Sequence, residues 1–128
     1  MKIEHIALWT RNLEKMREFY QTYFQMNSGQ RYENAKKGFL SYFLSFDTGA
    51  RIELMTKTNM PGHFEPKQDF NGLTHFAISV GDKMKVNAIT EQLRKDGFDI
   101  AAEPRTTGDG YYESVILDPE GNRIEITE

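Results

Sequence analysis

The pattern of apolar and polar positions divides the chain into two amphipathic helices and a series of short strands. Residues 13–25 predict a helix whose core stripe recurs at three- and four-residue spacing: Leu13, Met16, Phe19, Tyr20, Tyr23 and Phe24. Thr10 or Asn12 can cap this helix. A second helix begins after Asp82 and ends at Gly97, with a stripe formed by Val86, Ile89 and Leu93.

Runs of alternating, β-branched or aromatic residues predict the strands. They cover residues 2–9, 30–34, 39–46 and 50–56 in the first half, and 72–80, 98–105, 111–117 and 123–127 in the second. Glycine-containing turns separate several of them. Each half therefore has the order β-α-β-β-β, and the predicted fold class is α+β, with curved mixed sheets.

The second half of the chain repeats the plan of the first. The run KIEHIALWT at residues 2–10 resembles GLTHFAISV at residues 72–80, with His5 and His75 at corresponding places. Both halves close on the tripeptide Arg-Ile-Glu, so an offset of about 70 residues persists through the chain. The two copies of this tripeptide are residues 51–53 and 123–125.

This repeat predicts one domain, residues 1–128, that is built from two modules sharing the same plan. The modules cover residues 1–56 and 72–128, and residues 57–71, which show no periodicity, form the linker. His63 lies in this linker. A linker histidine is usually a surface residue, although loops of this kind can also close over a site.

Four residues at matching places in the two modules are candidate metal ligands: His5, Glu53, His75 and Glu125. Their neighbours in sequence are apolar, so the four side chains point away from the helices. If the two modules curve toward each other, these side chains converge. Two imidazoles and two carboxylates suit zinc, nickel, cobalt, iron(II) or manganese. The alternative, a solvated polar sheet face, explains the alternation but not the recurring His–Glu pairing.

Composition narrows the class of protein. Of the 128 residues, 38% are hydrophobic and 27% are charged, as in globular domains. A net charge of −3 without a basic stripe argues against nucleic-acid binding. The absence of cysteine excludes disulfides and thiolate metal sites. Because no leader-like or membrane-spanning run is present, we expect a cytoplasmic protein without a membrane partner.

With these motifs in place, the chain resembles the vicinal oxygen chelate superfamily and, within it, the glyoxalase I (lactoylglutathione lyase) family. The resemblance covers all the predicted strands, and the segment DPEGNRIE at residues 118–125 is a strong superfamily signature. It implies that a divalent ion, nickel, cobalt or zinc, binds His5, Glu53, His75 and Glu125. A carboxylate at Glu53 favours proton-transferring isomerases and epimerases over the three-ligand resistance enzymes and extradiol dioxygenases.

The resemblance also implies a mechanism. The metal stabilises the enediolate formed when a proton leaves the carbon beside a carbonyl, in a small carbonyl compound or its thiol adduct. Glu125 is the first choice for the base and Glu53 the second. Trp9 and Lys57 replace an arginine and an asparagine that commonly hold glutathione. Since an indole has a single N–H donor, we interpret Trp9 as a pocket wall, and Lys57 as a point charge for an anion.

Two further questions stay open at this level. We expect a homodimer in which the ligands of module one join those of module two across subunits, as in small relatives; a site within one chain is the alternative. The function could also be another reaction on this scaffold, such as epimerisation or thiol transfer. A non-catalytic ligand-binding or resistance module would instead stack an aromatic ligand on Trp9, Tyr111 and Tyr112, although these tyrosines are better explained as ordinary strand residues.

Overall fold

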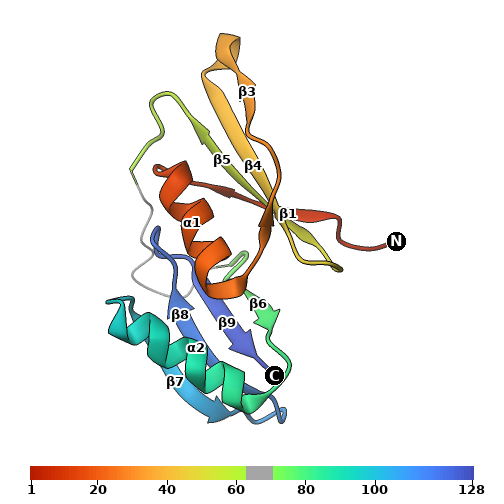
Figure 1. Cartoon of the computed structure of the whole chain (residues 1–128), viewed down its shortest axis with the longest axis vertical. Helices are drawn as coiled ribbons and strands as arrows, with labels where there is room; N and C mark the ends of the chain where they lie inside the picture. The colour runs from red at the N-terminus through yellow and green to blue at the C-terminus, as the bar shows by residue number, and fades with distance from the viewer. Residues whose placement is uncertain (63–70) are drawn as a thin grey trace. The chain divides into compact units, whose positions relative to one another are not determined.

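The computed structural model describes residues 1–62 and 71–128, so the linker histidine His63 lies outside the described residues. The chain forms two compact units, Met1–His63 and Phe64–Glu128, and each is described here by itself. Each unit combines one α-helix with one mixed sheet (Figure 1). Over the described ranges, neither α-helix has the length and apolar character needed to cross a bilayer.

In the first unit, the helix follows the first strand in the sequence and precedes the other strands. Its elements are β1 His5–Trp9, α1 Leu13–Phe24, β2 Asn27–Ser28, β3 Tyr32–Asn34, the 3₁₀ turn Ala35–Lys37, β4 Phe39–Ser45 and β5 Arg51–Lys57. The sheet has the order β1-β5-β4-β2, and β3 also pairs with β4. β1 runs parallel to β5, and β5 runs antiparallel to β4. The first and last strands of the unit are therefore neighbours.

The second unit repeats this topology with fewer strands. Its elements are β6 His75–Ser79, α2 Lys83–Lys95, β7 Ile100–Thr106, β8 Tyr112–Leu117 and β9 Arg123–Thr127. The order β6-β9-β8-β7 again joins the first and last strands in parallel. The prediction of an α+β fold with paired βαβββ modules is confirmed by these elements.

Helix α1 ends one residue before the predicted limit of residue 25, and the residues that follow it form a strand that the sequence did not predict. The helix ends at Phe24, and Gln25, which caps it, adopts the left-handed conformation with φ 55°. This conformation turns the chain early, so Asn27 and Ser28 become the short strand β2 beside β4. Turn-forming residues here serve a strand because the left-handed residue has already reversed the chain.

Helix α1 is capped by Asn12 and packs its predicted stripe against β4 and β5. Asn12 Oδ1 accepts a hydrogen bond from the Lys15 backbone N–H at 3.0 Å, while the Thr10 hydroxyl accepts one from the Asn12 N–H. Five stripe residues of the helix are buried, as are three strand residues on the covered face of the sheet: Leu13, Met16, Phe19, Tyr20, Phe24, Leu44, Ile52 and Leu54. This side of the sheet is therefore closed to solvent.

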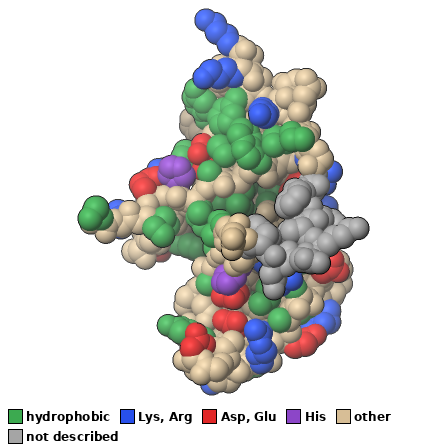
Figure 2. All heavy atoms as spheres, turned by 180° about the vertical axis from the view of Figure 1, so that it is seen from behind, with side chains coloured by type: hydrophobic (Ala, Val, Ile, Leu, Met, Phe, Trp, Pro, Cys, Tyr) green, Lys and Arg blue, Asp and Glu red, His purple; other side chains and the backbone are tan. Residues whose placement is uncertain are grey.

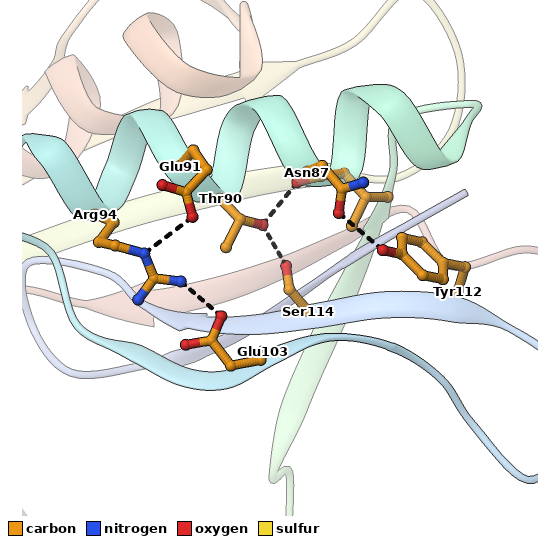
Figure 3. Close-up of polar contacts among 8 residues, drawn as sticks. Asn87, Thr90, Glu91, Arg94, Glu103, Tyr112 and Ser114 are labelled. Atoms are coloured by element: carbon orange, nitrogen blue, oxygen red, sulfur yellow. Dashed lines mark hydrogen bonds and ion pairs between the residues drawn. The ribbon is translucent and has the colours of Figure 1, made fainter.

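Helix α2 covers one face of the second sheet and is joined to it by polar as well as apolar contacts (Figure 3). The apolar contact is formed by residues with no exposed surface: Val86, Leu93, Ile116, Ile124 and Ile126. Among them, Thr90 Oγ1 donates to the Val86 carbonyl at 2.7 Å and lies 2.7 Å from Ser114 Oγ. Arg94 bonds Glu103, and Asn87 bonds Tyr112, nearer the surface. These contacts determine which β8 side chains point to the helix.

The buried hydroxyl pair gives a first prediction. Thr90→Val should lower the free energy of unfolding by ~1–3 kcal/mol, because the Ser114 hydroxyl is left buried without its acceptor. Adding Ser114→Ala should recover part of that loss, since no orphaned hydroxyl then remains. Urea unfolding of wild type, both single variants and the double variant measures this coupling. Strictly additive losses would contradict it.

Candidate functional site

The first unit places a histidine and a glutamate together on the sheet face opposite α1. His5 pairs in register with Arg51, and Glu53 lies two residues further along β5 on the same face. The distance from His5 Nε2 to Glu53 Oε2 is 3.8 Å. The Glu53 side chain is 17% exposed and that of His5 is 39% exposed, so the pair is reachable from solvent.

The second unit repeats this arrangement. His75 pairs with Arg123, and Glu125 lies two residues further along β9. The distance from His75 Nε2 to Glu125 Oε1 is 3.2 Å, with side-chain exposures of 42% and 19%. Figure 2 shows a histidine with acidic side chains beside it in each unit. The internal repeat thus extends from the strands to the contact between the two functional groups.

The second nitrogen of each imidazole is also engaged. His5 Nδ1 contacts the Glu4 carboxylate, which in turn pairs with Arg51. These hydrogen bonds, first that of His5 and then that of Arg51, lower the pKa of Glu4. His75 Nδ1 lies 3.0 Å from the Thr74 hydroxyl. Holding Nδ1 in this way leaves Nε2 directed at the glutamate, as in histidines that bind metals.

The four predicted ligands therefore form two His–Glu pairs, one in each unit. Within either unit, the described residues include no group of three or more His, Cys, Asp or Glu side chains arranged as metal ligands. The imidazole and the carboxylate of each pair are two donors of the kind that a borderline divalent cation prefers, half of a tetrahedral shell or a third of an octahedral one. That all four bind one ion stays a prediction.

Beside the first pair, aromatic side chains line the open sheet face. Phe43 contacts the His5 ring edge-on at 5.4 Å and lies 4.1 Å from the Arg51 guanidinium. Trp9 is 45% exposed, and Lys57 Nζ lies 5.1 Å from its ring centroid. Hydrophobic side chains accordingly gather over this unit in Figure 2. The two predicted substrate-binding residues, Trp9 and Lys57, are thus in contact with each other.

The two tyrosines of the aromatic-binding alternative lie in different surroundings. Tyr112 points to α2, where its hydroxyl donates to Asn87 Oδ1 at 2.8 Å. Its ring is therefore on the face opposite to His75 and Glu125. Tyr111 is 56% exposed and precedes β8. Tyr112 is thus unsuited to stacking a ligand beside the second pair.

A further carboxylate, which the sequence analysis missed, lies on the same face as the second pair. Glu113 is only 9% exposed, and its Oε1 accepts a 3.4 Å hydrogen bond from Arg105 Nη2. Burial, followed by the charge of Glu125, raises the pKa of Glu113, against the opposing effect of Arg105. The signal available in the sequence was the one acidic residue in the strand-forming run YESVIL.

Comparison with known proteins bears on the whole chain. The sequence model of the Glyoxalase/Bleomycin resistance protein/Dioxygenase superfamily matches residues 2–126. No match was found among curated proteins. Glyoxalase I of Leishmania major, described as trypanothione-dependent, is similar in structure with a TM-score of 0.80 and 19% identity, over 100% of this chain and 86% of that one.

Two bacterial structures are similar over nearly their full length. A glyoxalase family protein from Enterococcus faecalis has a TM-score of 0.79 and 20% identity, over 99% of this chain and 97% of that one. A glyoxylase/bleomycin resistance protein/dioxygenase domain from Frankia sp. EAN1pec has a TM-score of 0.83 and 16% identity, over 99% and 96%. At these identities the likeness establishes the fold.

Glu113 gives a prediction for stability against pH. Because its pKa is raised in the folded state, folding loses stability as the pH rises through the ordinary carboxyl range, about pH 4, toward the raised value. Glu113→Gln cannot ionise, so its melting temperature relative to wild type should increase from about pH 4 to about pH 7. Circular dichroism melts across this range measure the difference. Glu103→Gln, an exposed carboxylate in β7, is the control, and a pH-independent difference for Glu113→Gln would contradict the prediction.

Proposed function

Because the chain belongs to the Glyoxalase/Bleomycin resistance protein/Dioxygenase superfamily, we propose that it is a metal-dependent lyase or isomerase of the glyoxalase I type. It transfers a proton within a small carbonyl compound or the adduct of such a compound with a thiol. The observation that supports this proposal best is the repeated pair of His Nε2 and Glu carboxylate, at 3.8 Å in one unit and 3.2 Å in the other.

In this proposal, one divalent ion, nickel, cobalt or zinc, is held by the two pairs: His5, Glu53, His75 and Glu125. The contacts at Nδ1 support it, because Glu4 and Thr74 orient each imidazole with Nε2 toward its glutamate. When bound, such an ion polarises the substrate's oxygens and stabilises negative charge that develops on them.

The proton transfer belongs to a glutamate. Glu125 takes the proton from the carbon beside the carbonyl and returns it to the neighbouring carbon, while the hydroxyl proton moves between the two oxygens. Its side chain is 19% exposed and stands on an interior strand between β6 and β8, which positions it firmly. Glu53, 17% exposed at the corresponding place on β5, is the second choice for this role.

The aromatic face of the first unit bounds the substrate. Trp9, with Phe39 at 6.0 Å, forms a wall, and Lys57 offers a positive charge beside it. The thiol need not be glutathione, and the Leishmania major relative is itself described as trypanothione-dependent. A second candidate function, binding of an aromatic ligand without catalysis, is favoured by the exposure of Trp9. Epimerisation or thiol transfer would use the same ligands.

We further propose a homodimer. The pair from the first unit of one subunit then joins the pair from the second unit of the other, so each dimer has two sites. The separation of the chain into two compact units with one pair each supports this arrangement. A site completed within one chain is the competing arrangement.

Turnover tests the proposed reaction. Nickel- and zinc-loaded protein should convert hemithioacetals of methylglyoxal, and Glu125→Gln should lower kcat by ~10²–10⁴-fold because the base is lost. Metal content measured on the same samples must be retained in the variant. Glu103→Gln, in the same unit but on a strand facing α2, should keep wild-type activity. Absence of turnover with every thiol adduct, together with metal-independent binding of an aromatic ligand, would favour the binding module.

Mixed dimers test the shared metal site. His5→Ala and His75→Ala should each lose stoichiometric metal, because each removes an imidazole from every site. In dimers that combine one chain of each variant, one site keeps all four ligands, so metal binding should return in part. Mass spectrometry of the metal and light scattering make the measurement. Metal retained by both single variants would exclude these ligands, and a metal-binding monomer would exclude the shared arrangement.

A further inference from the structure

Glu113 faces the same side of the second sheet as the pair of His75 and Glu125. Figure 3 shows Tyr112 and Ser114 directed from β8 toward α2, so the residue between them points to the opposite face. In the register of β8 and β9, Val115 lies opposite Glu125 and Glu113 lies opposite Thr127. Diagonal neighbours of this kind are ~7–8 Å apart along the sheet. Glu113 is therefore a diagonal neighbour of Glu125, the proposed base, on the same face of the sheet.

The partner of Glu113 is determined by irregularities in β7. Ile100 lies opposite Ile116, and continuing this register would place Glu103 opposite Glu113, with two like charges facing. Two register shifts in β7 place Arg105 there instead. Glu103 is turned to the helix side, where it accepts a 2.6 Å bond from Arg94. Such bulges often re-aim a side chain beside a functional site.

The Glu113 carboxylate has capacity left for a ligand. The residue is 9% exposed, yet the single hydrogen bond of its carboxylate within the described residues is the 3.4 Å contact to Arg105. An ionised carboxylate can accept about four hydrogen bonds, and burying one with most of them unmade is costly. The Arg105 side chain is 48% exposed and contacts the Glu113 carboxylate through one nitrogen, Nη2. A donor group on a bound molecule would supply the hydrogen bonds that the described residues leave unmade.

We propose that Glu113 is a specificity-determining residue that accepts a hydrogen bond from an ammonium or hydroxyl group on the thiol part of the substrate. Arg105 holds the carboxylate in position. This inference rests on the proposed function, which places the reacting carbon at Glu125. The separation from Glu125 puts the donor several bonds away from that carbon, and the adjacent acids Glu113 and Glu125 select a donor over an anion.

Binding of unreactive thioethers tests this directly. Full-length ¹⁵N-labelled protein is titrated with 2-(methylthio)ethylamine, 2-(methylthio)ethanol, their methoxy analogue, which cannot donate, and 3-(methylthio)propionate. The amides of 112–114 and 105 should respond to the ammonium or hydroxyl compound at about tenfold lower concentration than to the methoxy compound, a difference typical of one hydrogen bond to a charged group. A response to the ammonium compound alone would show that Glu113 recognises positive charge. Equal responses to the ammonium and hydroxyl compounds would show that it recognises a hydrogen-bond donor.

Variants complete the test. Glu113→Gln should weaken the preference for donors, because an amide oxygen without charge accepts a weaker hydrogen bond than a carboxylate. Glu113→Asp should keep part of the preference, and Glu103→Gln should leave it unchanged. Equal binding of all four thioethers, preference for the carboxylate compound, or no response at these amides would overturn the inference. So would a preference that is undiminished in Glu113→Gln.

The outcome separates the two proposals, since these thioethers cannot be turned over. Hemithioacetals made from the corresponding thiols supply the kinetic comparison. If they are converted, but Glu113→Gln leaves the ranking of their kcat/KM values unchanged, the proposed function stands and the role of Glu113 falls. If Glu113 controls thioether binding but no adduct is converted, the role in recognition stands and the reaction is wrong.

Discussion

Both His–Glu pairs depend on one constraint: along β5 and β9, side chains alternate between the sheet face that the helix covers and the open face. Ile52 and Leu54 are buried on either side of Glu53, and Ile124 and Ile126 are buried on either side of Glu125. Slipping either strand by one residue would expose two large aliphatic side chains and bury the carboxylate. At ~25 cal/mol per Å² of apolar surface, that exchange is far costlier than any single polar contact on the open face. Apolar burial against the helices therefore holds the acids in place.

The same constraint explains how much of the site could be predicted from the sequence. The phase of β1 and β5 places His5 and Glu53 on one face, and the parallel pairing of the first and last strands brings them within 3.8 Å. The repeat then gives His75 and Glu125 the same relation. Capping by Asn12 and the apolar stripe of α1 follow from residue types and spacings that are visible in the sequence. The fold follows from these regularities as well.

Other features depend on contacts that periodicity does not encode. The engagement of Nδ1 by Glu4 and Thr74 is decided by side-chain geometry at the residue before each histidine. The pairing of Glu113 with Arg105 depends on two register shifts in β7, which a run such as IAAEPRT does not reveal. Strand β2 arises from the left-handed Gln25 and not from strand propensity at Asn27 and Ser28. Binding of one ion by both pairs would depend on how the units assemble. The strand pattern within each module does not encode that assembly.

The strand order also gives the two residues of each pair different local stability. His5 and His75 stand on β1 and β6, which are edge strands of their own sheets, whereas Glu53 and Glu125 stand on interior strands with a neighbour on both sides. An edge strand can detach by breaking one ladder of hydrogen bonds, so it opens at a lower free energy than the strand beside it. In each pair the imidazole is then the group that moves more easily, and the carboxylate is the group that stays fixed. Exchange of whatever the pair holds would proceed by fraying of the edge strand, without unfolding of either core.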